Sequence, residues 1–229
     1  MEHVEFILDT YDFSLSPKES LIPKILHMIW VGNRDQPPYI DTYKNKWAEL
    51  MPTWQIRLWT NSDINNQEFS DEILDKINES TIGAQKADIM RYSIIYKYGG
   101  VYLDTDVIPY RSLDPLLATA ARVILCHDME LTWQYISIGF FASVPNDPLF
   151  LYAIKLSLGA TLNTKDVHMH TGPRLMGEAV YCVKPDIKYL LLYTYYFYRN
   201  IAGEIDLTRF HRLVDFEPRF ATHFYAKDW

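Results

Sequence analysis

The stretch that decides the fold is Gly99-Gly100-Val101-Tyr102-Leu103-Asp104-Thr105-Asp106-Val107. Successive side chains of an extended strand point to opposite faces, so Tyr102, Asp104 and Asp106 are predicted to share one face. The two Asp Cα atoms would then lie about 6.6 Å apart. Two like charges at that separation repel each other unless a cation lies between them. The pattern therefore predicts a site for a hard divalent cation with oxygen ligands, Mn²⁺ or Mg²⁺.

The composition is that of a folded protein with a substantial core. The chain has 229 residues, of which 48% are hydrophobic and 15% aromatic, enough for one large domain or two small ones. A net charge of -7 argues against a nucleic-acid partner, which would require a basic surface. Cys126 and Cys182 do not form a ligand-spaced pair. They predict reduced thiols in a reducing compartment, with a single disulfide as the alternative.

The first residues of the chain are acidic rather than basic and lack the apolar run of a secretion signal. The longest apolar and aromatic stretch, residues 189–198, is shorter than the roughly 20 residues that span a bilayer. We expect it to pack in the core, although Lys184, Lys188 and Arg199 leave open a peripheral membrane contact. A cytoplasmic location is predicted.

Strands and helices alternate along the chain. The apolar run 22–32 predicts a strand buried on both faces, residues 38–50 a helix ended by Pro52, and residues 54–59 a second strand, which together make a βαβ unit. Further elements are predicted as helices over 71–78 and 84–98, a helix beginning at 113–117, helices through 149–156 and 175–179, and strands over 123–126 and 135–142.

Charged side chains on the long helix are predicted to meet the acidic strand. Asp88 and Arg91 lie three residues apart, where they can form an ion pair or reach a common ligand. Gly99 and Gly100 end this helix and turn the chain into the acidic strand. We therefore expect both pairs of residues to face one cleft at the carboxyl ends of the strands. His168 and His170 allow a zinc site on a strand face, but no further ligand has suitable spacing, so polar cleft or core histidines are favoured.

Four segments carry a resemblance to a known family: Ile22-Pro23-Lys24-Ile25-Leu26-His27-Met28-Ile29-Trp30-Val31-Gly32, Leu58-Trp59-Thr60, Ala87-Asp88-Ile89-Met90-Arg91-Tyr92, and Tyr96-Lys97-Tyr98-Gly99-Gly100-Val101-Tyr102-Leu103-Asp104-Thr105-Asp106. In this combination the chain resembles the sugar-binding-region glycosyltransferases with a DXD motif, family 32-like, which include the yeast initiating α-mannosyltransferases and capsular polysaccharide synthesis enzymes. The resemblance is close over residues 22–117 and loose elsewhere.

The resemblance implies an α/β GT-A fold, with a Rossmann-like mixed sheet flanked by helices and a small helical acceptor-side region. It implies a single domain, residues 1–229, made of an N-terminal lead (1–20), a nucleotide-sugar-binding half (21–117), and an acceptor-side half with a C-terminal lid (118–229).

The resemblance also implies roles for residues that bind the donor. Trp30 would stack on the nucleotide base while the Val31 backbone reads its edge. Asp88 and Arg91 would hold donor-sugar hydroxyls and a phosphate oxygen, and Tyr102 would add a hydroxyl contact.

The resemblance further implies which residues hold the metal and which take part in catalysis. Asp104 would bind the ribose and the water shell of the metal, Asp106 would ligate the metal, and His223 is the candidate third ligand. Trp229 would contact the diphosphate or the sugar. The catalytic set implied is Asp88, Arg91, Asp104 and Asp106. Relatives carry Asn where this chain has Ile138, which leaves the donor contact from that strand open.

The implied reaction is metal-dependent, retaining transfer of a hexose from a nucleoside diphosphate sugar to a glycan or glycolipid hydroxyl. A UDP-hexose is the favoured donor and GDP-mannose the alternative. Fungal relatives have an N-terminal membrane helix that this chain lacks, so a cytosolic bacterial or viral enzyme of polysaccharide biosynthesis is expected. More distant alternatives are a glycoside hydrolase, whose two carboxylates must flank the sugar, and a non-catalytic carbohydrate-binding protein.

Overall fold

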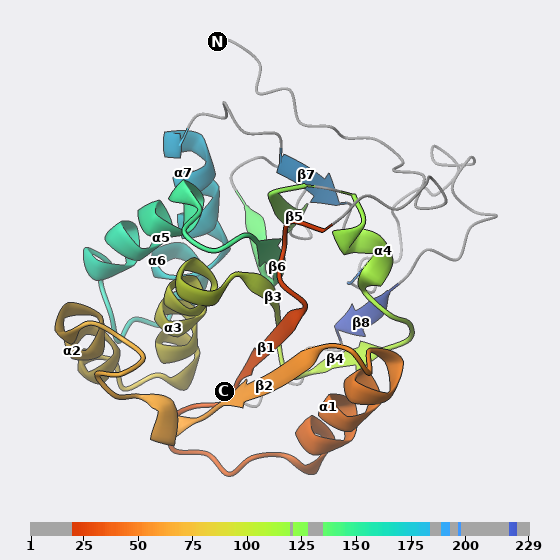
Figure 1. Cartoon of the computed structure of the whole chain (residues 1–229). Helices are drawn as coiled ribbons and strands as arrows, with labels where there is room; N and C mark the ends of the chain where they lie inside the picture. The colour runs from red at the N-terminus through yellow and green to blue at the C-terminus, as the bar shows by residue number, and fades with distance from the viewer. Residues whose placement is uncertain are drawn as a thin grey trace, which may run out of the picture.

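The computed structural model describes residues 20–119, 121–127, 135–183, 189–192, 197 and 220–223. They form a mixed sheet between layers of helices (Figure 1). The strands are β1 (Ile25–Ile29), β2 (Gln55–Trp59), β3 (Gly100–Leu103), β4 (Val107–Pro109), β5 (Val123–His127), β6 (Ile136–Ser143), β7 (Tyr189–Leu192) and β8 (Ala221–His223). The helices are α1 (Pro38–Leu50), α2 (Asp71–Glu79), α3 (Gly83–Tyr98), α4 (Asp114–Leu117), α5 (Pro148–Leu158), α6 (Val167–His170) and α7 (Pro173–Val183), with a 3₁₀ turn, η1 (Asn61–Asp63).

The main sheet has the strand order β2-β1-β3-β6-β5-β7, and β4 and β8 form a second, two-stranded sheet. Strand β1 is parallel to both β2 and β3, which confirms the predicted βαβ unit of β1, α1 and β2. Strand β6 is antiparallel to its neighbours β3 and β5, so the sheet is mixed.

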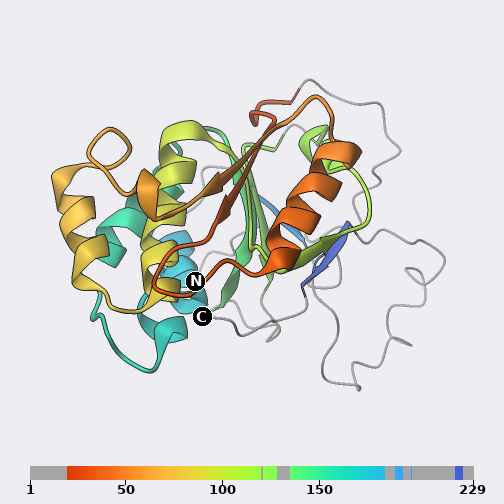
Figure 2. The same cartoon turned by 90° about the horizontal axis from the view of Figure 1, so that it is seen from below.

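Two hydrophobic cores lie on opposite faces of the main sheet. Helices α2, α3, α5 and α7 cover one face, and α1, α4 and the β4–β8 pair cover the other (Figure 2). Strand β3 contributes to both cores, because Tyr102 packs in the first while Val101 and Leu103 pack in the second. Burial on both faces explains why the strands read as apolar runs.

Helix α3 is buried on nearly all sides. Residue Gln85 and every residue from Ala87 to Ile95 are buried, because the helix lies against the sheet and also packs against α2 and α5. The polar side chains in this run are consequently enclosed by protein.

A pair of glycines turns the chain from α3 into β3, as predicted. Gly99 has φ +64° and Gly100 has φ +89°, a region that glycine enters without steric cost. A Cβ at Gly100 would also lie 2.5 Å from the carbonyl oxygen of Ile25, so a side chain would push β3 away from β1.

One prediction about a strand was wrong, and one alternative is excluded. The stretch 99–107 is not one strand: β3 ends at Leu103, residues 104–106 form a turn, and β4 begins at Val107. Pairing with β6 ends at Leu103, after which the chain leaves the main sheet and β4 pairs with β8. His168 and His170 lie on the short helix α6, whose first turn is capped by Asp166, and not on a strand face.

The apolar stretch near the C-terminus packs in the core where it is described. Strand β7 is buried, and the ring of Phe197 stacks on Phe140 with centroids 3.8 Å apart. Lys184, Lys188 and Arg199 lie outside the described residues. Of the helices that the structure describes, none combines the length and the apolar character required to cross a bilayer. Cys126 and Cys182 are free thiols.

Candidate functional site

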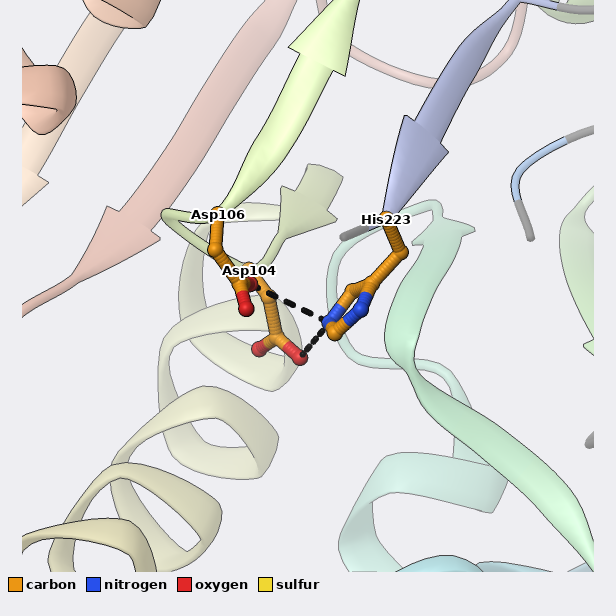
Figure 3. Close-up of side chains that lie close together, drawn as sticks. All are labelled: Asp104, Asp106 and His223. Carbon is orange, nitrogen blue, oxygen red and sulfur yellow. Dashed lines mark hydrogen bonds and ion pairs between the residues drawn. The ribbon is translucent and has the colours of Figure 1, made fainter. Parts of the chain in front are cut away.

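Three side chains from the turn and the small sheet converge on one point (Figure 3). Asp104 and Asp106 lie in the turn between β3 and β4, and His223 ends β8. The pairing of Val107 with His223 places the imidazole beside the turn. His223 Nε2 lies 3.2 Å from Asp104 Oδ2 and 3.1 Å from Asp106 Oδ1. The candidate ligand atoms of the three residues all lie within 4.8 Å of one another.

The charged groups of this triad shift one another's pKa values. Burial disfavours a charged imidazole, but the two carboxylates more than offset it and raise the pKa of His223 to about 9. Burial also disfavours ionised Asp104, yet Arg91 and His223 lower the pKa of that carboxyl to about 2. The site therefore favours a positive charge between its carboxylates, here supplied by the imidazolium.

The donor atoms of the triad suit a hard divalent cation. Carboxylate oxygens and an imidazole nitrogen are ligands that Mn²⁺ accepts, and the carboxylates also suit Mg²⁺. The side chains of Asp104, Asp106 and His223 already point toward one another, so binding would not require them to be gathered from separate regions (Figure 3).

Asp88 and Arg91 form the predicted ion pair, and the pair reaches the triad. Arg91 Nη2 lies 3.0 Å from Asp88 Oδ1, and Nη1 lies 3.1 Å from Asp104 Oδ1. The Tyr102 hydroxyl donates to the same oxygen of Asp104 over 2.8 Å, and the guanidinium lies over the Tyr102 ring, 4.5 Å from its centroid. Asp104 is thus held from two sides before any ligand arrives.

Protein acceptors surround the guanidinium of Arg91, which is only 3% exposed. Besides the two carboxylates, its Nε donates to the carbonyl oxygen of Ala87 and its Nη1 to that of Ile138, over 3.3 and 2.7 Å. Ile138 thus contacts Arg91 through its backbone and not through its side chain. No side-chain pattern reports a backbone acceptor, so sequence reasoning missed this contact.

Thr171, which lies between α6 and α7, was also missed as a site residue. Its hydroxyl donates to Asp88 Oδ2 over 2.6 Å. Burial raises the pKa of Asp88 to about 7, against the opposing effects of Arg91 and of this hydrogen bond. The only signal in the sequence was the Thr171-Gly172-Pro173 segment before α7.

A pocket of about 270 Å³ lies where β1 ends and α3 begins, lined by Trp30, Val31, Gly32, Asn33, Arg34, Thr81, Ile82 and Gly83. The Trp30 indole donates to the carbonyl oxygen of Arg34 over 3.3 Å. The Asn61 side chain holds the loop at Gly32 by two hydrogen bonds. Its Oδ1 accepts from the Gly32 amide over 3.0 Å, and its Nδ2 donates to the Gly32 carbonyl oxygen over 2.8 Å. A Cβ at Gly83 would lie 2.6 Å from the carbonyl oxygen of Val31, so the wall of the pocket requires a glycine there.

Helix α3 connects this pocket to the triad. Gly83 lies at the pocket and Arg91 at the triad, about 12 Å further along the helix axis. Predicted site residues Trp30 and Val31 thus lie at one end of α3. Asp88 and Arg91 lie near the middle of the helix, and Arg91 connects them to the group formed by Tyr102, Asp104, Asp106 and His223. Trp229 lies outside the described residues.

The chain matches a known family model over residues 37–123, described as the glycosyltransferase sugar-binding region containing a DXD motif. It is 28% identical over 164 residues to the uncharacterized glycosyltransferase L373 of Acanthamoeba polyphaga mimivirus, an alignment that covers 70% of this chain and 65% of that protein. It is 36% identical over 143 residues to mannosyl phosphorylinositol ceramide synthase SUR1 of Saccharomyces cerevisiae, covering 61% of this chain and 35% of the relative. The inositol phosphoceramide mannosyltransferase 3 of Schizosaccharomyces pombe is 35% identical over 118 residues, an alignment that covers 50% of this chain and 33% of that protein. The chain therefore spans about a third of these two yeast relatives.

Solved structures share the fold at low sequence identity. The PaToxG glycosyltransferase superposes with a TM-score of 0.55 at 17% identity, covering 71% of this chain and 70% of that one. The galactosyltransferase LgtC, solved with donor and acceptor sugar analogs, superposes with a TM-score of 0.51 at 13% identity. The superposition covers 88% of this chain and 87% of LgtC. The mixed sheet flanked by helices is the GT-A fold, as predicted.

Proposed function

We propose that this chain transfers a hexose from a nucleoside diphosphate sugar to a glycolipid or glycan hydroxyl, because residues 37–123 match the model of the DXD-containing glycosyltransferase region and the chain has a GT-A fold. The observation that carries the proposal is the convergence of Asp104, Asp106 and His223 at the carboxyl end of β3. Ligands of α/β proteins bind beyond this edge of the sheet, where the strand order reverses.

Mn²⁺ or Mg²⁺ is the proposed metal, held by Asp104, Asp106 and His223. Such a cation, when bound, stabilises negative charge on a leaving diphosphate. The contribution of the chain itself is to hold the ligands ready: Arg91 and Tyr102 fix Asp104 by hydrogen bonds to one of its oxygens. Preorganised groups of this kind reorganise little during the reaction.

The pocket at Trp30 is the proposed site for the nucleotide base. An indole at its wall offers a flat face for stacking, and the neighbouring Val31 backbone would read the edge of the base. From there the diphosphate would run along the start of α3 toward the triad. Asp88 and Arg91 would meet the donor sugar and a phosphate oxygen. Because Arg91 also supports Asp104, we propose that it both binds the donor and positions this carboxylate.

The donor sugar is best supported as mannose. Both yeast relatives are named for mannosyl transfer to inositol phosphoceramide. These names favour GDP-mannose over the UDP-hexose that the family resemblance favoured, and a glycolipid as the acceptor. We propose transfer with retention, by attack on the same face of the sugar, in keeping with the family resemblance.

A thermal-shift panel tests the proposal. GDP-mannose, UDP-galactose, UDP-glucose and UDP-N-acetylglucosamine would each be added with and without Mn²⁺, using Asp41→Asn, an exposed change on α1, as the control. A ligand at about 100 times its dissociation constant stabilises the native state by about 2.7 kcal/mol, which is a shift of about 5–10 °C for a chain of this size. We expect this shift with GDP-mannose and Mn²⁺ together. The absence of a metal-dependent shift with any of the four sugar nucleotides would refute the proposed function.

A further inference from the structure

We propose that Thr171 is a positioning residue for the donor sugar, because its hydroxyl fixes the orientation of the Asp88 carboxylate. The inference rests on the proposed function and adds a residue of the acceptor-side half to the donor site. Thr171 follows α6 and is fully buried, and its Oγ1 lies 2.6 Å from Asp88 Oδ2. The other oxygen of Asp88 lies 3.0 Å from Arg91 Nη2.

These two contacts define the rotation of the carboxylate. A carboxylate held only by Arg91 can turn about its Cβ–Cγ bond, whereas one held at both oxygens cannot. The hydroxyl also has a second acceptor in reach, the carbonyl oxygen of Val167 at 3.4 Å. The hydroxyl has one proton, and the shorter contact to a charged acceptor is the stronger one, so the proton is directed to Asp88.

Thr171 is itself held in place by the backbone around it. Its amide donates to the carbonyl oxygen of Val167 over 3.1 Å, and its own carbonyl oxygen accepts from the Tyr92 hydroxyl over 2.6 Å. A Cβ at the next residue, Gly172, would lie 2.8 Å from the Cα of His168, so the chain passes α6 too closely for a side chain there. A hydroxyl on so constrained a backbone is suited to aim a neighbouring group.

Because Asp88 is buried, loss of the hydrogen bond from Thr171 would change the state of its carboxylate. Asp88 is 2% exposed, and burial raises the pKa of its carboxyl to about 7, with Arg91 and Thr171 acting in the opposite direction. Without the hydroxyl, one carboxylate oxygen would be left buried without this donor, which is energetically unfavourable. The Asp88 carboxylate would then rotate or take up a proton. Either change removes a correctly oriented hydrogen-bond acceptor for the donor sugar.

Thr171→Val, which keeps the branched shape and removes the hydroxyl, gives the central test. Dissociation constants for GDP-mannose and for GDP, and for UDP-galactose and UDP, would be measured by calorimetry with Mn²⁺. We expect Thr171→Val to weaken binding of the sugar nucleotide that the wild type accepts by tenfold or more. Binding of the matching nucleoside diphosphate should change by less than about twofold, because Asp88 is proposed to meet the sugar, which a nucleoside diphosphate lacks.

Two further variants separate positioning from a general loss of structure. Thr171→Ser retains the hydroxyl and should restore sugar-nucleotide binding to within about threefold of the wild type. Ser157→Ala removes another fully buried hydroxyl, which donates to the carbonyl oxygen of Ile154, and should leave both dissociation constants unchanged. If Thr171→Val does not fold, Tyr92→Phe removes the hydrogen bond to the Thr171 carbonyl, and we expect the same selective loss at smaller size.

The outcomes distinguish the two proposals. Equal weakening of sugar nucleotide and nucleoside diphosphate, or no weakening of either, would overturn the role of Thr171 and leave the proposed function standing. Failure of the wild-type protein to bind any of the four sugar nucleotides of the thermal-shift panel would overturn both proposals.

Discussion

The imidazole of His27 on β1 donates from Nε2 to the carbonyl oxygen of Gly99, with 3.0 Å between the two atoms. The Trp59 indole N–H donates to Nδ1 of the same ring over 3.1 Å. An indole nitrogen can only donate, so Nδ1 must be unprotonated and the proton of the neutral ring lies on Nε2. His27 is 1% exposed and thus joins β1, β2 and the glycine turn as a neutral side chain.

Protonation of His27 should destabilise the fold. Burial lowers its pKa from 6.5 to about 4, with Arg57 adding to the effect and the Gly99 hydrogen bond opposing it. Between pH 6.5 and 4 the unfolded chain binds more protons at this residue than the folded chain, so stability falls as the pH falls through this range. The total loss from this group is about 3 kcal/mol. Urea unfolding of the wild type and His27→Gln at several pH values measures it.

Other titrating groups are common to both chains, so the difference between their unfolding free energies isolates His27. We expect His27→Gln to be less stable than the wild type at pH 7 and to close most of that gap at pH 4. Parallel curves across the whole range would contradict the assigned proton position.

Asp106→Asn should abolish the metal-dependent part of donor binding. The change removes one negative charge of the triad and leaves the shape of the side chain almost unaltered. We expect the Mn²⁺-dependent thermal shift to disappear and the rate of transfer to fall by about 10²-fold or more. The shift and the transfer rate would be measured beside the exposed control Asp41→Asn. A variant that kept full Mn²⁺-dependent transfer would show that Asp106 is not a metal ligand.

Arg91→Lys should be destabilising although it preserves the charge. A single ammonium cannot reproduce the planar fork that joins Asp88, Asp104 and the Ile138 carbonyl. We expect a loss of about 2–4 kcal/mol in unfolding free energy, because buried carboxylates lose their partner. Urea unfolding compares it with Arg174→Lys on an exposed position of α7, which should behave as the wild type does. Equal stability of the two variants would refute the arrangement.

Asn61→Ala should weaken nucleotide binding with little effect on the metal triad. The Asn61 side chain holds both polar backbone groups of Gly32, whose φ is +113°, so its loss frees the loop that carries the pocket wall. We expect about tenfold weaker binding of GDP or UDP, measured by calorimetry. Asn65→Ala in the same segment, whose side chain contacts Ser62 and Gln67, is the control and should bind normally. If both variants bind alike, the Asn61 side chain does not support the pocket.

Local patterns predicted the parts of the site that lie close together in sequence. Asp88 and Arg91 share a helix, so their spacing predicted an ion pair or a common ligand, and the structure contains the ion pair. Gly99 and Gly100 likewise predicted the turn into β3. Both have a positive φ, and Gly100 lies too close to the Ile25 carbonyl for a side chain.

Long-range contacts set the rest, and no local pattern encodes them. The turn at residues 104–106 depends on where pairing with β6 ends, and strand periodicity carries no signal for that point. Thr171 meets Asp88 across 83 residues, and Asn61 meets Gly32 across 29. His223 was a candidate only because the family resemblance drew attention to it. Its place beside Asp106 follows from the pairing of β4 with β8.

That pairing also governs when the site can assemble during synthesis. His223 lies 119 residues after Asp104, and it reaches the turn only as part of β8. A nascent chain still attached to the ribosome can form β1, β2 and β3 early, since these strands are close in sequence. Its two aspartates must then wait, without their imidazole, until residue 223 has left the exit tunnel. The three side chains are therefore brought together only once β8 has paired with β4.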